Sequence, residues 1–333
     1  MQAKQILMVC PASPDANNGN WHTASRWAAF LRGRYEVAIA TVDAACAAID
    51  AGAMPDLLIA LHARRSAPAL AAFALAHPQR PRVLVLTGTD LYRDIAHDRA
   101  ARAALDDATD LVLLQEAGLA LLPPGLRARA HVIYQSAPAL ASAPATVAAA
   151  APERADTRDI AMIGHLRDEK DPLTFMRAAA LVTDPAVRLL HVGRALDPAL
   201  GEAARATAAA HPRYQWLGEL PHPATRALLA GCHAMAICSR MEGGAHVIIE
   251  AVGAGVPVLA SDINGNRGML GDDYAGYFAV GDSAALAALI ARSVADAAFH
   301  AHLRAQCAAR APLFAPAAER AAVMQLAGHL CGT

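Results

Sequence analysis

Two glutamates eight residues apart, Glu242 and Glu250, flank a glycine-rich turn in the stretch EGGAHVIIEAVGAGVPVLASDINGN. Backbone N–H groups of such a turn, and the positive end of a helix starting near Ala245, suit a phosphate or a sugar hydroxyl. Gly243 and Gly244 would let a ligand approach the backbone because they carry no Cβ. Glu250 falls in an apolar context, where an unpaired charge is costly. The pattern predicts a polar ligand site; the alternative is a helix-terminus carboxylate and a solvated helix residue.

The segment PASPDANNGNWHTASRW gathers polar residues at the expected start of the first helix. Asn18, Gly19, Asn20 and Thr23 would form a neutral, donor-rich nest for a small oxyanion. The alternative, a helix cap with Asx turns, has equal physical support.

Metal chemistry has no sequence signature here. The histidines lack HExxH or another metal spacing, no D-x-D occurs, and no cysteine pair has zinc-ligand spacing. We therefore expect neither a catalytic metal nor a cofactor, and we expect cations and helix N-termini to meet the charge of a leaving group.

Composition limits the classes of function. The 333 residues exceed the size of one growing core, which favours two domains. A net charge of −1 provides no basic field for nucleic acid or an anionic membrane. The first apolar run is too short for a signal peptide, and no apolar run reaches 18 residues. We therefore expect a cytoplasmic protein without nucleic-acid or membrane partners.

Short apolar runs alternate with longer helical stretches, which predicts parallel sheets covered on both faces. The strands expected in the first half are QILMVC, EVAIAT, LLIAL, RVLVLT, LVLL and HVIY. Those expected in the second half are DIAMIG, VRLLHVG, AMAICS, PVLAS and GYFAV.

Residues 136–159, rich in Pro, Ala and Ser, read as a linker between these halves. We predict a domain at residues 1–150 and a second at 151–333 that includes a C-terminal helix. Open α/β sheets bind ligands beyond the carboxyl ends of their strands, so a site in an interdomain cleft is expected.

The order E-x7-E, E-A-x-x-x-G-x-P-V and A-S-x-x-x-G resembles the donor region of retaining GT-B glycosyltransferases of the sucrose-synthase-like family. The resemblance implies two Rossmann-like domains. It places Glu250 at the ribose of a nucleotide sugar and Glu242 at the sugar ring. The glycine loop would offer backbone amides. The usual E-G-F-G is E-G-G-A-H here, which leaves the hexose contacts to Ala245 and His246.

The stretch MIGHLRDEKDP matches a second element of that family, a G-R…K sequence that holds the diphosphate. Lys170 fits the lysine, His165 occupies the arginine position, and Arg167 could supply the missing charge. Arg194 could add phosphate charge. The alternative is a solvated turn of mixed charge, and GHLRDEK alone would be weak evidence, but its position at the start of the second domain, before E-x7-E, favours the functional interpretation.

The motifs NNGNW-x-T-A-x-R-W, TGTDLYRD and EGGAHVIIEA together resemble the selenosugar synthases of selenoneine biosynthesis. This resemblance implies transfer from a UDP-sugar, UDP-N-acetylglucosamine in particular, to selenophosphate. It assigns the acceptor to Asn18, Gly19, Asn20, Trp21, Thr23 and Asp90. Whether the protein also binds a partner enzyme of the same pathway is left open.

Three other functions fit the residues. They are an ordinary glycosyltransferase acting on a hydroxyl, a non-catalytic nucleotide-sugar sensor, and a UDP-sugar epimerase. The sequence leaves open the donor sugar, the anomeric outcome, the fate of the phosphate on selenium and the oligomeric state.

Overall fold

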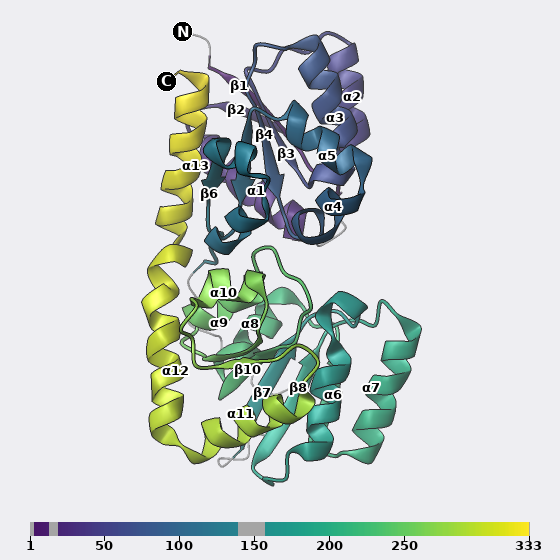
Figure 1. The fold of residues 1–333 in the computed structure, drawn as a ribbon, viewed down its shortest axis with the longest axis vertical. Coiled ribbons are helices and arrows are strands. Elements are labelled where there is room, and N and C mark those ends of the chain that lie inside the picture. Colours follow the sequence, from purple (N-terminus) through teal and green to yellow (C-terminus); the bar gives the residue numbers. More distant parts are fainter. Residues whose placement is uncertain (1–2, 13–18, 139–156, 333) are drawn as a thin grey trace. The chain divides into compact units, whose positions relative to one another are not determined.

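The computed structural model describes residues 3–12, 19–138 and 157–332, and these form two compact α/β units (Figure 1). The first unit comprises Met1–Ser136, Glu242–Gly244 and Leu313–Thr333. The second comprises Ala137–Met241 and Ala245–Pro312.

The first unit contains a six-stranded parallel sheet of order β2-β1-β3-β4-β5-β6. Its strands are β1 Gln5–Val9, β2 Glu36–Ala40, β3 Leu57–Leu61, β4 Arg82–Leu86, β5 Asp110–Leu113 and β6 Ala130–Val132. Its α-helices are α1 Gly19–Leu31, α2 Val42–Asp50, α3 Ala63–Ala76, α4 Ile95–His97, α5 Arg99–Asp107 and α13 Pro316–Cys331. Its other helical turns are η2 Asp90–Asp94, η3 Glu116–Leu121 and η4 Pro124–Arg129.

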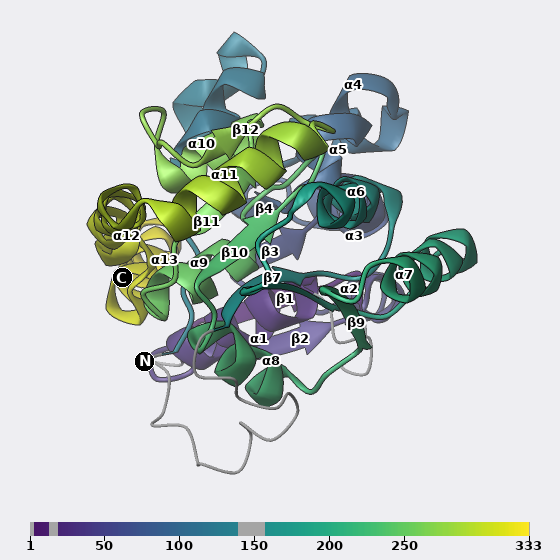
Figure 2. The ribbon, with the colours of Figure 1, turned by 90° about the horizontal axis from the view of Figure 1, so that it is seen from below.

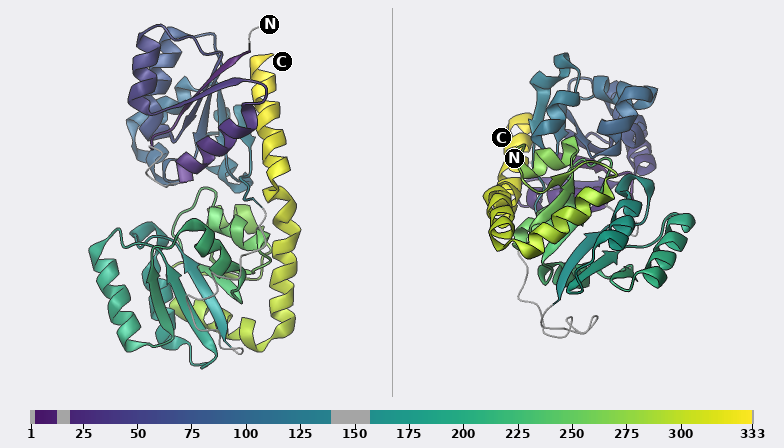
Figure 3. Two further views of the ribbon diagram at one scale, coloured as in Figure 1. Left: turned by 180° about the vertical axis from the view of Figure 1, so that it is seen from behind. Right: turned by 60° about the horizontal axis from the view of Figure 1, so that its bottom comes forward.

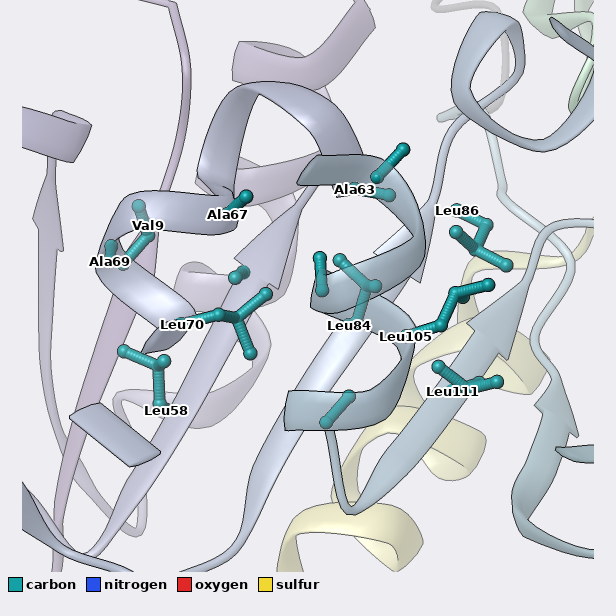
Figure 4. Packing of buried hydrophobic residues seen from close by; sticks show 14 of the residues in the cluster. Val9, Leu58, Ala63, Ala67, Ala69, Leu70, Leu84, Leu86, Leu105 and Leu111 are labelled. Carbon is teal, nitrogen blue, oxygen red and sulfur yellow. The ribbon is translucent and has the colours of Figure 1, made fainter. Parts of the chain in front are cut away.

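Alternate residues of each strand in this unit point to opposite faces of the sheet, and each face has its own hydrophobic core. Leu84 of β4 packs with Leu70 of α3 and Leu105 of α5 on one face (Figure 4). Val83 and Val85 of the same strand point to the core under α1 and α13 on the other face. Two apolar faces explain why the strands read as continuous hydrophobic runs.

Helix α13 lies beside α1 (Figure 3), and the buried carboxylate of Glu319 fixes it there. Glu319 accepts hydrogen bonds from Arg26 Nε (2.7 Å), Arg26 Nη2 (2.9 Å) and Trp27 Nε1 (2.8 Å). It also accepts bonds from the backbone N–H and the hydroxyl of Ser136. These five donors meet the cost of burying the charge, which is high for an unpaired carboxylate.

The second unit contains a parallel sheet of order β12-β11-β10-β7-β8-β9, the order of the dinucleotide-binding fold. Its strands are β7 Arg158–Ile163, β8 Val187–Val192, β9 Tyr214–Gly218, β10 Ala234–Ile237, β11 Val258–Ser261 and β12 Tyr277–Phe278. Its α-helices are α6 Pro172–Leu181, α7 Pro198–Ala210, α8 His222–Ala230, α9 His246–Gly253, α10 Asn264–Leu270, α11 Ser283–Ala295 and α12 Ala297–Arg310. It also contains the short turn η6 Asp168–Lys170, and the turn η7 Ala311–Phe314 follows α12. Helices α6 and α11 lie on one face of the sheet, and α8 and α9 lie on the other (Figure 2).

The two Rossmann-like parallel sheets confirm the fold expected from the sequence. One strand was missed, because YQWLG forms the half-exposed edge strand β9 and lacks a continuous apolar run. The predicted boundary at residues 150 and 151 lies outside the described residues. Leu313–Thr333 group with the first unit, whereas the sequence placed the C-terminal helix with the second. Glu319 and its partners are the physical reason for that difference.

Candidate functional site

The second sheet has a switch point between β7 and β10, where the chain order reverses. Arg240, three residues after β10, joins the two loops that leave this edge. Its backbone N–H donates to Glu169 O at 2.9 Å, and its Nη2 lies 3.5 Å from Asp171 Oδ1. Ligands of open α/β sheets bind at such an edge, so this is where the second unit should hold one.

Glycines bring the ends of β7, β8 and β9 close together. The N–H of Gly193 donates to Gly218 O at 2.7 Å. A Cβ on Gly193 would lie 2.0 Å from Gly164 O, and the φ of Gly193 is +152°. Only glycine fits this position without displacing the neighbouring backbone.

Three cations predicted for the phosphate side lie on the loops after β7 and β8. Leu166 and Ala195 pair these two loops as an isolated parallel bridge, next to Arg167 and Arg194. The Lys170 stem passes over Gly164, where an added Cβ would lie 3.6 Å from Lys170 Cδ.

Two of these cations have loose ion pairs. Arg167 Nε lies 4.0 Å from Glu169 Oε2, and Arg194 Nε lies 3.8 Å from Glu219 Oε2. Both arginine side chains are exposed, at 46% and 62%. Exposed pairs at such distances contribute little to stability, so a phosphate can compete for these guanidinium groups.

His165, at the arginine position, contributes a neutral donor. Its Nδ1 accepts the backbone N–H of Arg194 at 3.1 Å, so the proton of the neutral ring lies on Nε2. Burial lowers the pKa of His165, and the charges of Arg194, Arg167 and Lys170 lower it further against the opposing charge of Glu219. The ring can therefore donate one hydrogen bond without adding charge.

Glu250 lies in the second turn of α9, as expected, and is only 4% exposed. His222 Nε2 donates to its Oε1 at 2.5 Å. Arg226 Nε and His246 Nε2 lie 3.8 Å and 3.7 Å from the same oxygen. The sequence drew attention to His246 but not to His222 or Arg226. These two lie 28 and 24 positions from Glu250, and no local pattern connects them with it.

The structure assigns the two glutamates of the E-x7-E motif to different units. Glu242–Gly244 belong to the first unit, where a Cβ on Gly243 would lie 2.4 Å from Thr87 O. Burial raises the pKa of Tyr92, and the charge of Glu242 adds to that rise. Gly244 is equally confined, since a Cβ there would lie 2.7 Å from Leu114 Cβ. Ala245 is the residue that caps α9.

Asp90 was predicted to contact the acceptor. In the structure it links the loops that follow strands β3 and β4. Its fully buried carboxylate accepts the backbone N–H groups of Ala63 (2.9 Å), Thr87 (3.0 Å) and Gly88 (2.7 Å). Three backbone donors already occupy it, so we correct its role from acceptor contact to positioning of the loops after β3 and β4.

Of the residues predicted at the acceptor, Gly19, Asn20 and Trp21 lie at the helix start where the sequence placed them. Asn18 lies outside the described residues, whereas these three form the first turn of α1. Thr23 is buried, and its hydroxyl donates to Gly19 O at 2.8 Å and accepts from Gln135 Nε2. Thr23 therefore stabilises the helix start rather than facing a ligand.

His62 is a residue whose importance the sequence did not show. It follows β3, is 3% exposed, and has a φ of +71°, which is uncommon for a residue with a side chain. Its Nε2 lies 3.2 Å from Thr89 Oγ1. Burial lowers the pKa of His62 against the opposing charge of Asp90, so the ring is neutral near pH 7.

Within the described residues, no group of three or more His, Cys, Asp or Glu side chains could hold a metal ion. In the same residues no single helix is long and apolar enough to cross a membrane. One pair, Ser283–Ala295 with Ala297–Cys331, meets the length and composition test jointly but is bent by 105°.

Residues 147–313 match the family model described as glycosyl transferases group 1. Among solved structures, Anabaena HepE in complex with UDP and glucose is similar, with a TM-score of 0.80 and 19% identity over 99% of this chain and 100% of that one. Sucrose-phosphate synthase from Thermosynechococcus elongatus has a TM-score of 0.80 and 18% identity, covering 99% of each chain. A mutant of S. aureus TarM with fondaparinux, alpha-GlcNAc-glycerol and UDP has a TM-score of 0.63 and 14% identity, covering 83% of this chain and 55% of TarM. These likenesses establish the GT-B fold.

Proposed function

The chain belongs to the glycosyl transferases group 1 family, and on that premise we propose that it transfers a sugar from a UDP-sugar to selenophosphate. The arrangement of residues at the carboxyl edge of the second sheet supports the donor part of this proposal, the binding of a UDP-sugar. Loosely paired cations at the ends of β7 and β8 suit a diphosphate, and a buried carboxylate on α9 suits ribose hydroxyls. HepE and TarM were solved with UDP, which supports the same nucleotide here.

In the proposed reaction, selenium attacks the anomeric carbon while the bond from that carbon to the diphosphate oxygen breaks. The bonding electron pair leaves with UDP. Arg167, Lys170 and the neutral donor of His165 would stabilise the charge that develops on the diphosphate. Glu250 would anchor the ribose and Glu242 would orient the sugar. Because selenium is a strong nucleophile, orientation and leaving-group stabilisation are the main tasks of the protein.

The acceptor assignment rests on the motif resemblance and on the start of α1. This helix has no acidic residue in its first turn, and Gly19 is exposed there. The positive end of the helix dipole favours a small anion. N-acetylglucosamine as the donor sugar rests on the same resemblance, and the alpha-GlcNAc-glycerol bound by TarM is in keeping with it.

The test is to incubate the protein with several UDP-sugars and selenophosphate, and to identify products by mass spectrometry from the selenium isotope pattern. We expect a selenium-containing sugar together with UDP, most rapidly from UDP-N-acetylglucosamine. A repeat with EDTA should give the same turnover. Loss of turnover with EDTA, restored by magnesium, would show that the cations do not replace a metal.

Transfer to a hydroxyl is the second candidate. It is supported by the structure of HepE with UDP and glucose, because glucose is a sugar that carries hydroxyl groups. A panel of alcohols and sugars in the same assay separates the candidates. UDP release with an alcohol and none with selenophosphate would replace the first proposal. Tight UDP-sugar binding without turnover for any acceptor would indicate a sensor, and conversion of the donor without an acceptor would indicate an epimerase.

A further inference from the structure

The carboxylate of Glu250 is held asymmetrically. Three nitrogen atoms, from His222, Arg226 and His246, approach it at 2.5, 3.8 and 3.7 Å, and all three approach Oε1. Among the described residues, no protein group donates a hydrogen bond to Oε2. A carboxylate accepts through both oxygens, so Oε2 is the oxygen left for a ligand.

Two helix starts create this arrangement. His222 and Arg226 lie one turn apart at the beginning of α8, and His246 and Glu250 lie one turn apart at the beginning of α9. Residues four apart share one face of a helix, and α8 packs against α9. The two pairs therefore meet across this contact.

The partners of Glu250 are themselves restrained to different degrees. Arg226 is 13% exposed, its Nη2 donates to Pro138 O at 2.5 Å, and its buried Nε has no hydrogen-bond acceptor among the described residues. Arg226 thus balances the charge of Glu250 without binding it tightly. His222 is half exposed, at 52%, yet makes the short hydrogen bond. Because its ring reaches solvent, His222 is not needed to fill the core.

We propose that His222 is a positioning residue for donor binding. By donating to Oε1, it fixes the plane of the carboxylate and leaves Oε2 for one ribose hydroxyl of the nucleotide. This inference rests on the proposed function, because it needs Glu250 to bind the ribose. His222 acts through Glu250 and does not itself touch the nucleotide.

The experiment compares the affinities of UDP, 2′-deoxy-UDP and 3′-deoxy-UDP by calorimetry. One hydrogen bond to a charged group makes wild-type protein prefer UDP over one deoxy form by about tenfold or more. His222→Phe keeps the ring size but removes the donor, and should lower this preference to about threefold or less. His222→Gln retains an N–H donor and should restore most of it. The matched control, His302→Phe, changes an exposed histidine of the same unit and should leave it unchanged.

The outcomes separate the ribose site from the role of His222. If His222→Phe prefers UDP over the deoxy nucleotides as strongly as wild type does, while Glu250→Gln loses this preference, His222 has no positioning role. Glu250 would still bind the ribose in that case. Equal affinity of wild-type protein for all three nucleotides, or unchanged discrimination in Glu250→Gln, would overturn the ribose site and this inference with it. A general loss of affinity in His222→Phe for all three ligands alike would indicate a structural role only.

Discussion

The two units differ in how their charged groups are paired. In the first unit, Asp90 accepts three backbone N–H groups and Glu319 accepts five hydrogen bonds. In the second unit, Arg167 and Arg194 are exposed with ion pairs of 4.0 and 3.8 Å, and Glu250 is contacted through one oxygen. Groups satisfied by the protein hold the fold, whereas loosely paired groups are available to a ligand.

The largest effect is expected in the first unit, at Glu319. Glu319→Ala removes the acceptor of Arg26, Trp27 and Ser136 and should lower the free energy of unfolding by about 3 to 5 kcal/mol. Chemical denaturation measures this loss, with Glu202→Ala, an exposed change on α7, as the control. A loss below about 1 kcal/mol, the size of an exposed pair, would show that the Glu319 network does not hold the unit together.

His191, a buried titratable group of the second unit, should make the stability of that unit depend on pH. Burial lowers the pKa of His191 to about 4. Between the unfolded value of 6.5 and about 4, the unfolded chain binds a proton that the folded chain does not. Stability is therefore complete above pH 6.5 and should fall by about 3 kcal/mol as the pH falls to 4.

His191→Phe tests this contribution, because it removes the titrating group. The difference in unfolding free energy between wild type and variant should shrink by about 3 kcal/mol from pH 7 to pH 4. The lost hydrogen bond with Tyr214 only adds a constant. A difference that stays the same at both pH values would refute the assignment.

Ligand binding offers a direct contrast between the units. Glu250→Ala should weaken UDP binding by about 2 kcal/mol, because one hydrogen bond to a charged group is lost. Asp90→Asn should reduce stability and leave the UDP affinity of the folded protein unchanged, since Asp90 serves the first unit. Calorimetric titration with UDP measures the affinity of both variants. Unchanged UDP affinity in folded Glu250→Ala would remove Glu250 from the site.

The smallest expected effect concerns the start of α1. A Cβ on Gly19 meets no described atom within 4 Å, so Gly19→Val should fold normally. The added side chain would cover the N–H groups of the helix start and should raise the KM for selenophosphate by about tenfold, or 1.4 kcal/mol. UDP affinity should not change. Equal losses for UDP and selenophosphate would mark this turn as a folding element and place the acceptor elsewhere.

The local sequence determined most of the fold. Eleven of the strand segments expected from apolar runs are strands, and helix α9 begins one residue from the expected position. Strands buried on both faces are apolar at nearly every position, so they can be predicted from the sequence without tertiary information. Edge strand β9 is only partly buried and lacks a continuous apolar run, so the sequence did not predict it.

What the sequence left undecided was which groups pair through space. Asp90 follows strand β4 and Thr23 lies near the start of helix α1, and both residue types allowed either a ligand contact or a structural hydrogen bond. Only the folded chain shows that backbone N–H groups occupy Asp90 and that the Thr23 hydroxyl bonds to its own helix. In the same way, His222 becomes the partner of Glu250 because α8 packs against α9. Composition and periodicity report local burial, whereas the choice of partner depends on distances that arise only when separate elements pack together.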